Sequence, residues 1–197
     1  MSVTLQKLFE KFLQNPLTNA AKCGIIIMLK GRELETLSPK SKQREGKKMT
    51  VKPLMIVMCG LPASGKSTYA NGLDPEKFAV ISTDAIRKEL NGNEADQANP
   101  QAVFDLAYKR IDALLDEGKN VCFDATNLKA RNRRWLCKKY GEKATLNCVY
   151  ASTSAEECIR RDVQRERVVG AEVINRMAGT MSAPSADEGF DFIMTLH

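Results

Sequence analysis

The sequence predicts an α/β protein in which a five-stranded parallel β-sheet carries helices on both faces. From residue 54 onward, short apolar segments alternate with segments of helical periodicity, which is typical of parallel βαβ units. The expected strands are Leu54–Cys59, Phe78–Ile81, Val121–Phe123, Thr145–Tyr150 and Phe190–Leu196. The expected helices are Lys66–Asn71, Ala85–Leu90, Gln101–Glu117, Lys129–Tyr140, Ala155–Glu166 and Glu172–Ser182. Gly118 and Gly141 stand where two of these helices should end.

The first 52 residues form an N-terminal extension to a catalytic domain at residues 53–197. Within residues 3–14 the apolar side chains recur at helical spacing, which predicts a short amphipathic helix that docks on the protein itself or on a partner. Residues 38–52 hold six basic residues and one acid, so we expect a solvated linker, with a nucleic-acid contact as the alternative. Met49 precedes the first strand, so translation beginning there is an alternative for residues 1–48.

The basic character of the chain is confined to this extension. The whole chain has a formal charge of +6, but residues 1–52 hold 11 Lys and Arg against 4 Asp and Glu, which leaves 19 against 20 for residues 53–197. The overall charge is therefore weak evidence that the catalytic part binds a polyanion.

The cysteines indicate a reducing compartment. The six cysteines show no CxxC pairing, and the single histidine is the last residue, so a zinc site is not expected. Three of them, Cys59, Cys122 and Cys148, lie in apolar strand segments, where a free cysteine acts as a small hydrophobic residue. The most apolar segment, residues 25–29, is far shorter than the roughly 20 residues that cross a bilayer. We expect a cytoplasmic protein.

The segment GLPASGKST, residues 60–68, fits the pattern of a phosphate-binding loop. It follows an apolar strand and opens a helix, so that glycines let backbone N–H groups turn toward phosphates near the positive end of the helix. Pro62 has no N–H, so the donors should come from Ala63 onward. Lys66 should reach the β- and γ-phosphates, and the Ser67 hydroxyl is the expected Mg²⁺ ligand. The expected nucleotide-binding residues are Gly60, Ala63, Ser64, Gly65, Lys66, Ser67 and Thr68.

Two carboxylates follow neighbouring strands of the expected sheet. Asp84 can accept a proton from an attacking hydroxyl, and Arg87, three residues later, can hold an anionic group of the acceptor. The alternative is that Asp84 caps a helix and Arg87 is its surface partner. Asp124 ends the third strand, where a carboxylate works with the metal ion, while Thr126 and Asn127 are expected to cap the next helix.

Two arginine-rich helices are candidates for substrate contact. Residues 129–140 contain six basic residues and no acid, so Arg131, Arg133 or Arg134 either contacts substrate or lies on a solvated face. Arg161 and Arg165 are one helical turn apart after the fourth strand, and on a closing segment they could offset the charge of a phosphoryl group in transfer. The alternative is a surface ladder with Asp162 and Glu166.

Four stretches together resemble the P-loop kinases of the 5′-hydroxyl polynucleotide kinase type, with related AAA-like kinases and the zeta-toxin-like branch. They are MCGLPASGKSTYA, ISTDAIRKEL, FDATNLKARNRR and CIRRDVQRER, from Met58 to about Arg167. The resemblance implies a sheet of strand order 2-3-1-4-5 and ATP with Mg²⁺ on Lys66 and Ser67. It also implies Asp84 as general base, Arg87 on the acceptor phosphate, and Arg165 as the lid arginine. The lid alignment can shift to Arg161 or Arg167, and the family often has Gly where this chain has Ala63.

Three functions are compatible with these residues. The first is an ATP-dependent kinase that moves the γ-phosphate to an acceptor hydroxyl, most readily the 5′-hydroxyl of RNA or DNA. The second keeps the kinase but changes the acceptor to a small metabolite or nucleoside, which the balanced charge of residues 53–197 favours. The third is an ATP-responsive switch without an acceptor. The Asp84 and Arg87 pair argues against this switch, because a switch needs no base for an acceptor.

Overall fold

The computed structural model describes residues 52–93 and 99–197, and the sheet within them has the expected order and direction. All strands are parallel and lie in the order β2-β3-β1-β4-β5. Their bounds are β1 Leu54–Cys59, β2 Phe78–Ser82, β3 Asn120–Asp124, β4 Thr145–Ala151 and β5 Phe192–Leu196. The expected N-terminal helix and basic linker lie outside the described residues, apart from Lys52.

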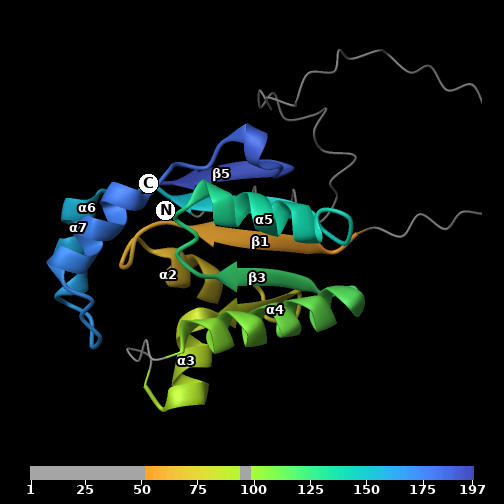
Figure 1. Ribbon diagram of the computed structural model, residues 1–197, viewed down its shortest axis with the longest axis horizontal. Coiled ribbons are helices and arrows are strands. Elements are labelled where there is room, and N and C mark those ends of the chain that lie inside the picture. The colour runs from red at the N-terminus through yellow and green to blue at the C-terminus, as the bar shows by residue number, and fades with distance from the viewer. Residues whose placement is uncertain (1–51, 94–98) are drawn as a thin grey trace, which may run out of the picture. The chain divides into compact units, whose positions relative to one another are not determined.

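The helices pack around this sheet in the arrangement shown in Figure 1. Their bounds are α2 Lys66–Asn71, α3 Thr83–Asn91, α4 Pro100–Asp116, α5 Ala130–Tyr140, α6 Ala155–Asp162 and α7 Ala171–Thr180, with a 3-10 turn η1 at Ala186–Glu188. Helices α4 and α5 cover the near face of the sheet and α2 lies on the far side, while α6 and α7 lie beyond the carboxyl ends of the strands (Figure 1). No helix among residues 52–93 and 99–197 is long and apolar enough to cross a bilayer.

The core forms because β1 lies at the centre of the sheet and is buried on both faces. Met55, Val57 and Cys59 point to one side, where they join the main apolar cluster with residues of α4 and α5 such as Ile111 and Leu136. A continuous apolar sequence is what a central parallel strand requires. A smaller apolar cluster, around Cys158 and Ile174, holds α6 against α7.

Helix α6 and strand β5 are shorter than the sequence predicts. Helix α6 stops at Asp162 rather than Glu166, because the Asp162 side chain turns to accept hydrogen bonds from the backbone N–H groups of Val169 and Gly170, at 2.8 Å each. Strand β5 begins at Phe192 rather than Phe190, because Phe190 is buried in the main apolar cluster instead of pairing with β4.

A buried ion pair joins α5 to the turn η1. Arg133 and Glu188 are both fully enclosed, and the guanidinium donates from Nε to Oε2 and from Nη2 to Oε1, at 2.6 Å each. The remaining nitrogen, Nη1, donates to the carbonyl oxygens of Asn127 at 2.8 Å and Leu128 at 2.9 Å. Each charge is thus compensated by fixed partners, which is the condition for an ion pair in a protein interior.

Glu188→Gln should lower the free energy of unfolding by about 3–5 kcal/mol, because it leaves the Arg133 charge buried without its counterion. Urea denaturation followed by circular dichroism measures the loss. Asp187→Asn is the matched control, since the neighbouring Asp187 pairs with Arg134 in solvent and its replacement should change stability little. Equal losses in the two variants would contradict this account.

Candidate active site

The phosphate loop connects the end of β1 to the start of α2 and adopts a backbone that admits few residue types. Gly60 has φ +146°, and a Cβ there would lie 2.7 Å from the carbonyl oxygen of Ala151 on β4. Gly65 precedes α2 with φ +98°, while Ala63 adopts φ +59° although it carries a side chain. A left-handed alanine costs on the order of 1 kcal/mol, which explains why glycine suits this position better.

Lys66 folds back over this loop. Its Nζ donates to the carbonyl oxygen of Leu61 at 2.6 Å and to Ser64 Oγ at 3.4 Å, and the side chain is buried. Burial lowers the pKa of Lys66, and the negative charges of Asp124 and Asp84 oppose that shift. An anion bound in the loop would favour the charged ammonium further.

Ser67 and Asp124 meet where Mg²⁺ is expected. The Ser67 hydroxyl donates to Asp124 Oδ2 at 2.8 Å. Burial raises the pKa of Asp124, and the Ser67 hydrogen bond and the Lys66 charge counteract it. A hydroxyl beside a carboxylate is a donor set that fits Mg²⁺, which takes oxygen ligands and is completed by phosphate oxygens and water. Among the described residues, no group of three or more His, Cys, Asp or Glu side chains could hold a metal ion on its own.

Asp84 lies beside this centre, because Ser82 of β2 pairs in register with Asp124 of β3. Ser82, not Asp84, caps α3: its Oγ accepts from the N–H of Ala85 at 3.4 Å. Asp84 is therefore free to pair through Oδ1 with Arg87 and through Oδ2 with Arg167 Nη1, which lies 3.2 Å away. The structure brings the predicted base and its arginine together, and it adds a second arginine that approaches from the far side of the site.

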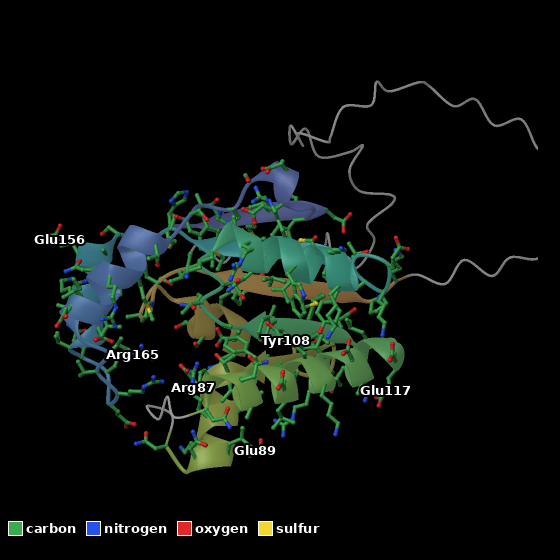
Figure 2. The ribbon with its side chains drawn as sticks, in the orientation of Figure 1. Arg87, Glu89, Tyr108, Glu117, Glu156 and Arg165 are labelled. Carbon is green, nitrogen blue, oxygen red and sulfur yellow. The ribbon has the colours of Figure 1, made fainter. Side chains whose placement is uncertain are left out.

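Three arginines were candidates for the lid, and the structure separates them. Arg161 pairs with Glu157 on the exposed side of α6. Arg165 lies in the segment 163–170 that follows α6, where it pairs with Asp162, and its charge opposes the rise in the pKa of Asp124. Arg167 pairs with Asp84, the predicted base. Figure 2 shows Arg165, on the segment after α6, and Arg87, on α3, both at the carboxyl end of the sheet.

The segment 163–170 is anchored by Asp162, a residue that the sequence predicted only as part of a surface ladder. Asp162 is 1% exposed, and its Oδ2 accepts both hydrogen bonds from Val169 and Gly170. Its Oδ1 lies 3.8 Å from Arg165 Nη1. One buried carboxylate therefore ties both ends of the loop that carries Arg165 and Arg167.

Helix α5 contributes differently from what its basic sequence suggested. Arg133 is buried, so it neither contacts substrate nor lies on a solvated face, and Arg134 pairs with Asp187. Asn127 does not cap the helix: it adopts φ +43°, and its Nδ2 donates to the carbonyl oxygen of Met58 at 2.8 Å. The N–H of Gly60 donates to the carbonyl oxygen of Thr126 at 3.0 Å. These residues hold the start of the phosphate loop rather than the start of α5.

The fold and the loop define a P-loop nucleotide-binding protein. Residues 55–184 match the model of a family described as AAA domain, AAA_33, and the chain belongs to that family.

Solved structures show the same fold. A chain of a Pnkp1/Rnl/Hen1 RNA repair complex matches with a TM-score of 0.59 at 22% identity, over 68% of this chain and 45% of that one. A sugar kinase from Janibacter sp. HTCC2649 matches with a TM-score of 0.54 at 20% identity, over 73% and 84%. A protein from Chloroflexus aurantiacus J-10-fl matches with a TM-score of 0.58 at 16% identity, over 74% and 85%. The chain thus spans less than half of the repair-complex chain, and the expected P-loop kinase fold with strand order 2-3-1-4-5 is confirmed.

Asp162→Asn should loosen the segment 163–170 without unfolding the domain. A hydrogen bond to a charged group contributes about 1.5–3 kcal/mol, so amide exchange at Val169 and Gly170 should accelerate by roughly 10- to 100-fold. Hydrogen–deuterium exchange with mass spectrometry measures this. Glu166→Gln, an exposed change in the same segment, is the control and should leave exchange unchanged. Unaltered protection in Asp162→Asn would show that other contacts hold the segment.

Proposed function

We propose that the protein is an ATP-dependent phosphotransferase that moves the γ-phosphoryl group to the 5′-hydroxyl of RNA or DNA. The observation that carries this proposal is Asp84, held between Arg87 and Arg167 at the strand end next to the phosphate loop. A protein that only binds or hydrolyses ATP has no need of a carboxylate with two arginines at this place. A kinase needs such a carboxylate to orient a hydroxyl and accept its proton.

The acceptor that suits this arrangement carries a phosphate near its hydroxyl. Both oxygens of Asp84 are paired with arginines, so an acceptor hydroxyl must compete with these side chains for the carboxylate. A phosphate on the acceptor competes for Arg87 and Arg167 and releases Asp84 toward the hydroxyl. The 5′ end of a polynucleotide has this chemistry, since its first internucleotide phosphate follows the 5′-terminal sugar.

Transfer then proceeds with each group in a separate role. Asp84 takes the proton as the hydroxyl oxygen forms its bond to the γ-phosphorus, and the bond from that phosphorus to the β–γ bridging oxygen breaks to leave ADP. Lys66 and Arg165 offset the charge of the moving group. Mg²⁺ held through Ser67 and Asp124 would neutralise phosphate charge. Positioning and electrostatics supply most of the catalysis in this class of reaction.

A small-molecule kinase is the second candidate, and the charge of the chain favours it. Residues 53–197 hold 19 basic and 20 acidic residues, which is not the excess expected of a surface that tracks a long polyanion. In either case the five described cysteines are free and buried, which supports a reducing, cytoplasmic location.

Asp84→Ala should reduce phosphoryl transfer by about 10²- to 10⁴-fold and leave ATP binding nearly intact, because Asp84 pairs with Arg87 and Arg167 and not with the residues expected to bind the nucleotide. Lys66→Ala, in contrast, should weaken both ATP binding and transfer. Transfer from γ-labelled ATP and calorimetric titration with ATP measure the two effects. Wild-type transfer by Asp84→Ala would refute the mechanism.

The acceptor should be identified by incubation with γ-labelled ATP and a panel of 5′-hydroxyl oligonucleotides, nucleosides and small alcohols. We expect label on the oligonucleotides, with a rate that falls steeply as salt rises, because phosphate contacts release counterions. Salt-insensitive labelling of a nucleoside or small alcohol would favour the second candidate. ATP hydrolysis with no labelled acceptor would favour a switch.

A further inference from the structure

The outward face of α5 carries a basic and aromatic group that the active site does not use. Once buried Arg133 and paired Arg134 are set aside, Arg131, Trp135 and Lys138 remain exposed on this helix. Their spacing of four and three residues places them on one face, which we call the α5 outer face. Helix α5 itself, residues 130–140, contains no acidic residue.

Trp135 is fixed on one side and open on the other. Its side chain is 45% exposed, and its ring centroid lies 4.8 Å from that of Tyr108 on α4. Lys139 Nζ lies 5.1 Å from the centroid of Tyr108 and 5.5 Å from that of Trp135, and Asp112 pairs with it at 3.0 Å. Figure 2 marks Tyr108 on α4, below α5. The ring is therefore packed against Tyr108 and Lys139 while part of it stays exposed, which leaves a surface on which a base can stack.

The charges around this ring suit a polyanion. Neither Arg131 nor Lys138 has an ion-pair partner among residues 52–93 and 99–197, although most other arginines of the site region do. Of the acids on neighbouring α4, Asp112 pairs with Lys139 and Asp116 pairs with Lys143, while Asp105 accepts a hydrogen bond from Gln101. Unpaired cations beside an open aromatic ring are the combination that binds single-stranded nucleic acid, in which bases stack and phosphates meet the cations.

The α5 outer face begins at the edge of the sheet where the active site lies. Helix α5 starts at Ala130, shortly after Asp124 ends β3, and runs from the carboxyl ends of the strands toward the opposite edge (Figure 1). From Arg131 to Lys138 the helix rises by about 10 Å. A strand whose 5′ end occupies the active site could thus continue along this face.

We propose that the α5 outer face binds the acceptor strand beyond its 5′-terminal nucleotides, with a base stacked on Trp135 and phosphates on Arg131 and Lys138. This inference rests on the proposed function, and it names the acceptor as single-stranded nucleic acid several nucleotides long. It accounts for a basic face on a domain of balanced charge, because α5 carries five of the 19 basic residues and no acidic residue.

Trp135 is the sole tryptophan of the chain, so intrinsic fluorescence reports directly on this face. Titration with an unlabelled 12-nucleotide 5′-hydroxyl single strand should quench the emission saturably, with an affinity that falls as salt rises. The double variant Arg131→Ala/Lys138→Ala keeps the tryptophan and should weaken the quench by at least about tenfold in affinity. Lys77→Ala/Lys119→Ala removes the same charge at the amino ends of β2 and β3, from residues paired with Asp74 and Glu117, and should bind like wild type.

The transfer assay gives a second readout. Trp135→Leu should raise the KM for the 12-nucleotide acceptor by about 5- to 100-fold, while the KM for a nucleoside 3′-monophosphate and kcat for both acceptors stay near wild type. Trp135→Phe keeps a ring and should restore most of the affinity. A structural role for Trp135 would instead impair both acceptors alike.

The outcomes separate this inference from the proposed function. Salt-sensitive quenching without any phosphorylated product would support the α5 outer face and overturn the kinase assignment. Phosphorylation of the 12-nucleotide strand with no quench, and with unchanged KM in Trp135→Leu, would support the kinase and overturn the inference. Quenching that is equal in the two double variants would also overturn it, because the cations of this face would then have no part in binding.

Discussion

All three guanidinium nitrogens of Arg133 donate hydrogen bonds to groups inside the protein, and these bonds hold the turn between β3 and α5. Two of its nitrogens are held by Glu188, and the third holds the carbonyl oxygens of Asn127 and Leu128. Within this turn, the carbonyl oxygen of Thr126 accepts a hydrogen bond from the N–H of Gly60. The side-chain amide of Asn127 donates to the carbonyl oxygen of Met58. The start of the phosphate loop is therefore held in place by a buried cation that does not contact substrate. Loss of the Glu188 counterion would displace this turn and, through the backbone, the nucleotide site.

The two halves of the site are coupled through Asp124. Its carboxylate accepts from Ser67 on the nucleotide side, and its strand pairs in register with the end of β2, from which Asp84 follows. The same geometry places Asp84 and Asp124 close enough for each to affect the pKa of Lys66. A parallel sheet produces this arrangement, because the carboxyl ends of neighbouring strands lie at one edge and bring together Asp84 and Asp124, which are 40 positions apart in sequence.

The parts of the site that could be predicted from sequence are those with local signals. The phosphate loop, Asp84 and Asp124 each follow an apolar strand, and the strands themselves are continuous apolar segments. The role of Arg133 was missed because a run of six basic residues indicates a solvated face, and its counterion lies 55 residues away. A local signal did exist, since Leu136, Cys137 and Tyr140 follow Arg133 at helical spacing and are all buried. Asp162 gave no such signal, because the predicted helix continued to Glu166 and so covered the first part of the loop in which the partners of Asp162 lie.

The charge of the site differs from that of the domain around it, and this difference bears on what it binds. Four cations, Lys66, Arg87, Arg165 and Arg167, lie near three carboxylates, those of Asp84, Asp124 and Asp162. The site therefore has one cation in excess, although residues 53–197 as a whole are nearly balanced. Such an excess is unfavourable within a partly buried site unless an anion offsets it. A nucleotide triphosphate accounts for Lys66 and Arg165 but leaves Arg167 engaged with Asp84. An acceptor that carries a phosphate can bind Arg167 and so separate it from Asp84, which frees the carboxylate to act as base. A neutral alcohol has no such group, so Asp84 would stay paired with Arg167 when it binds.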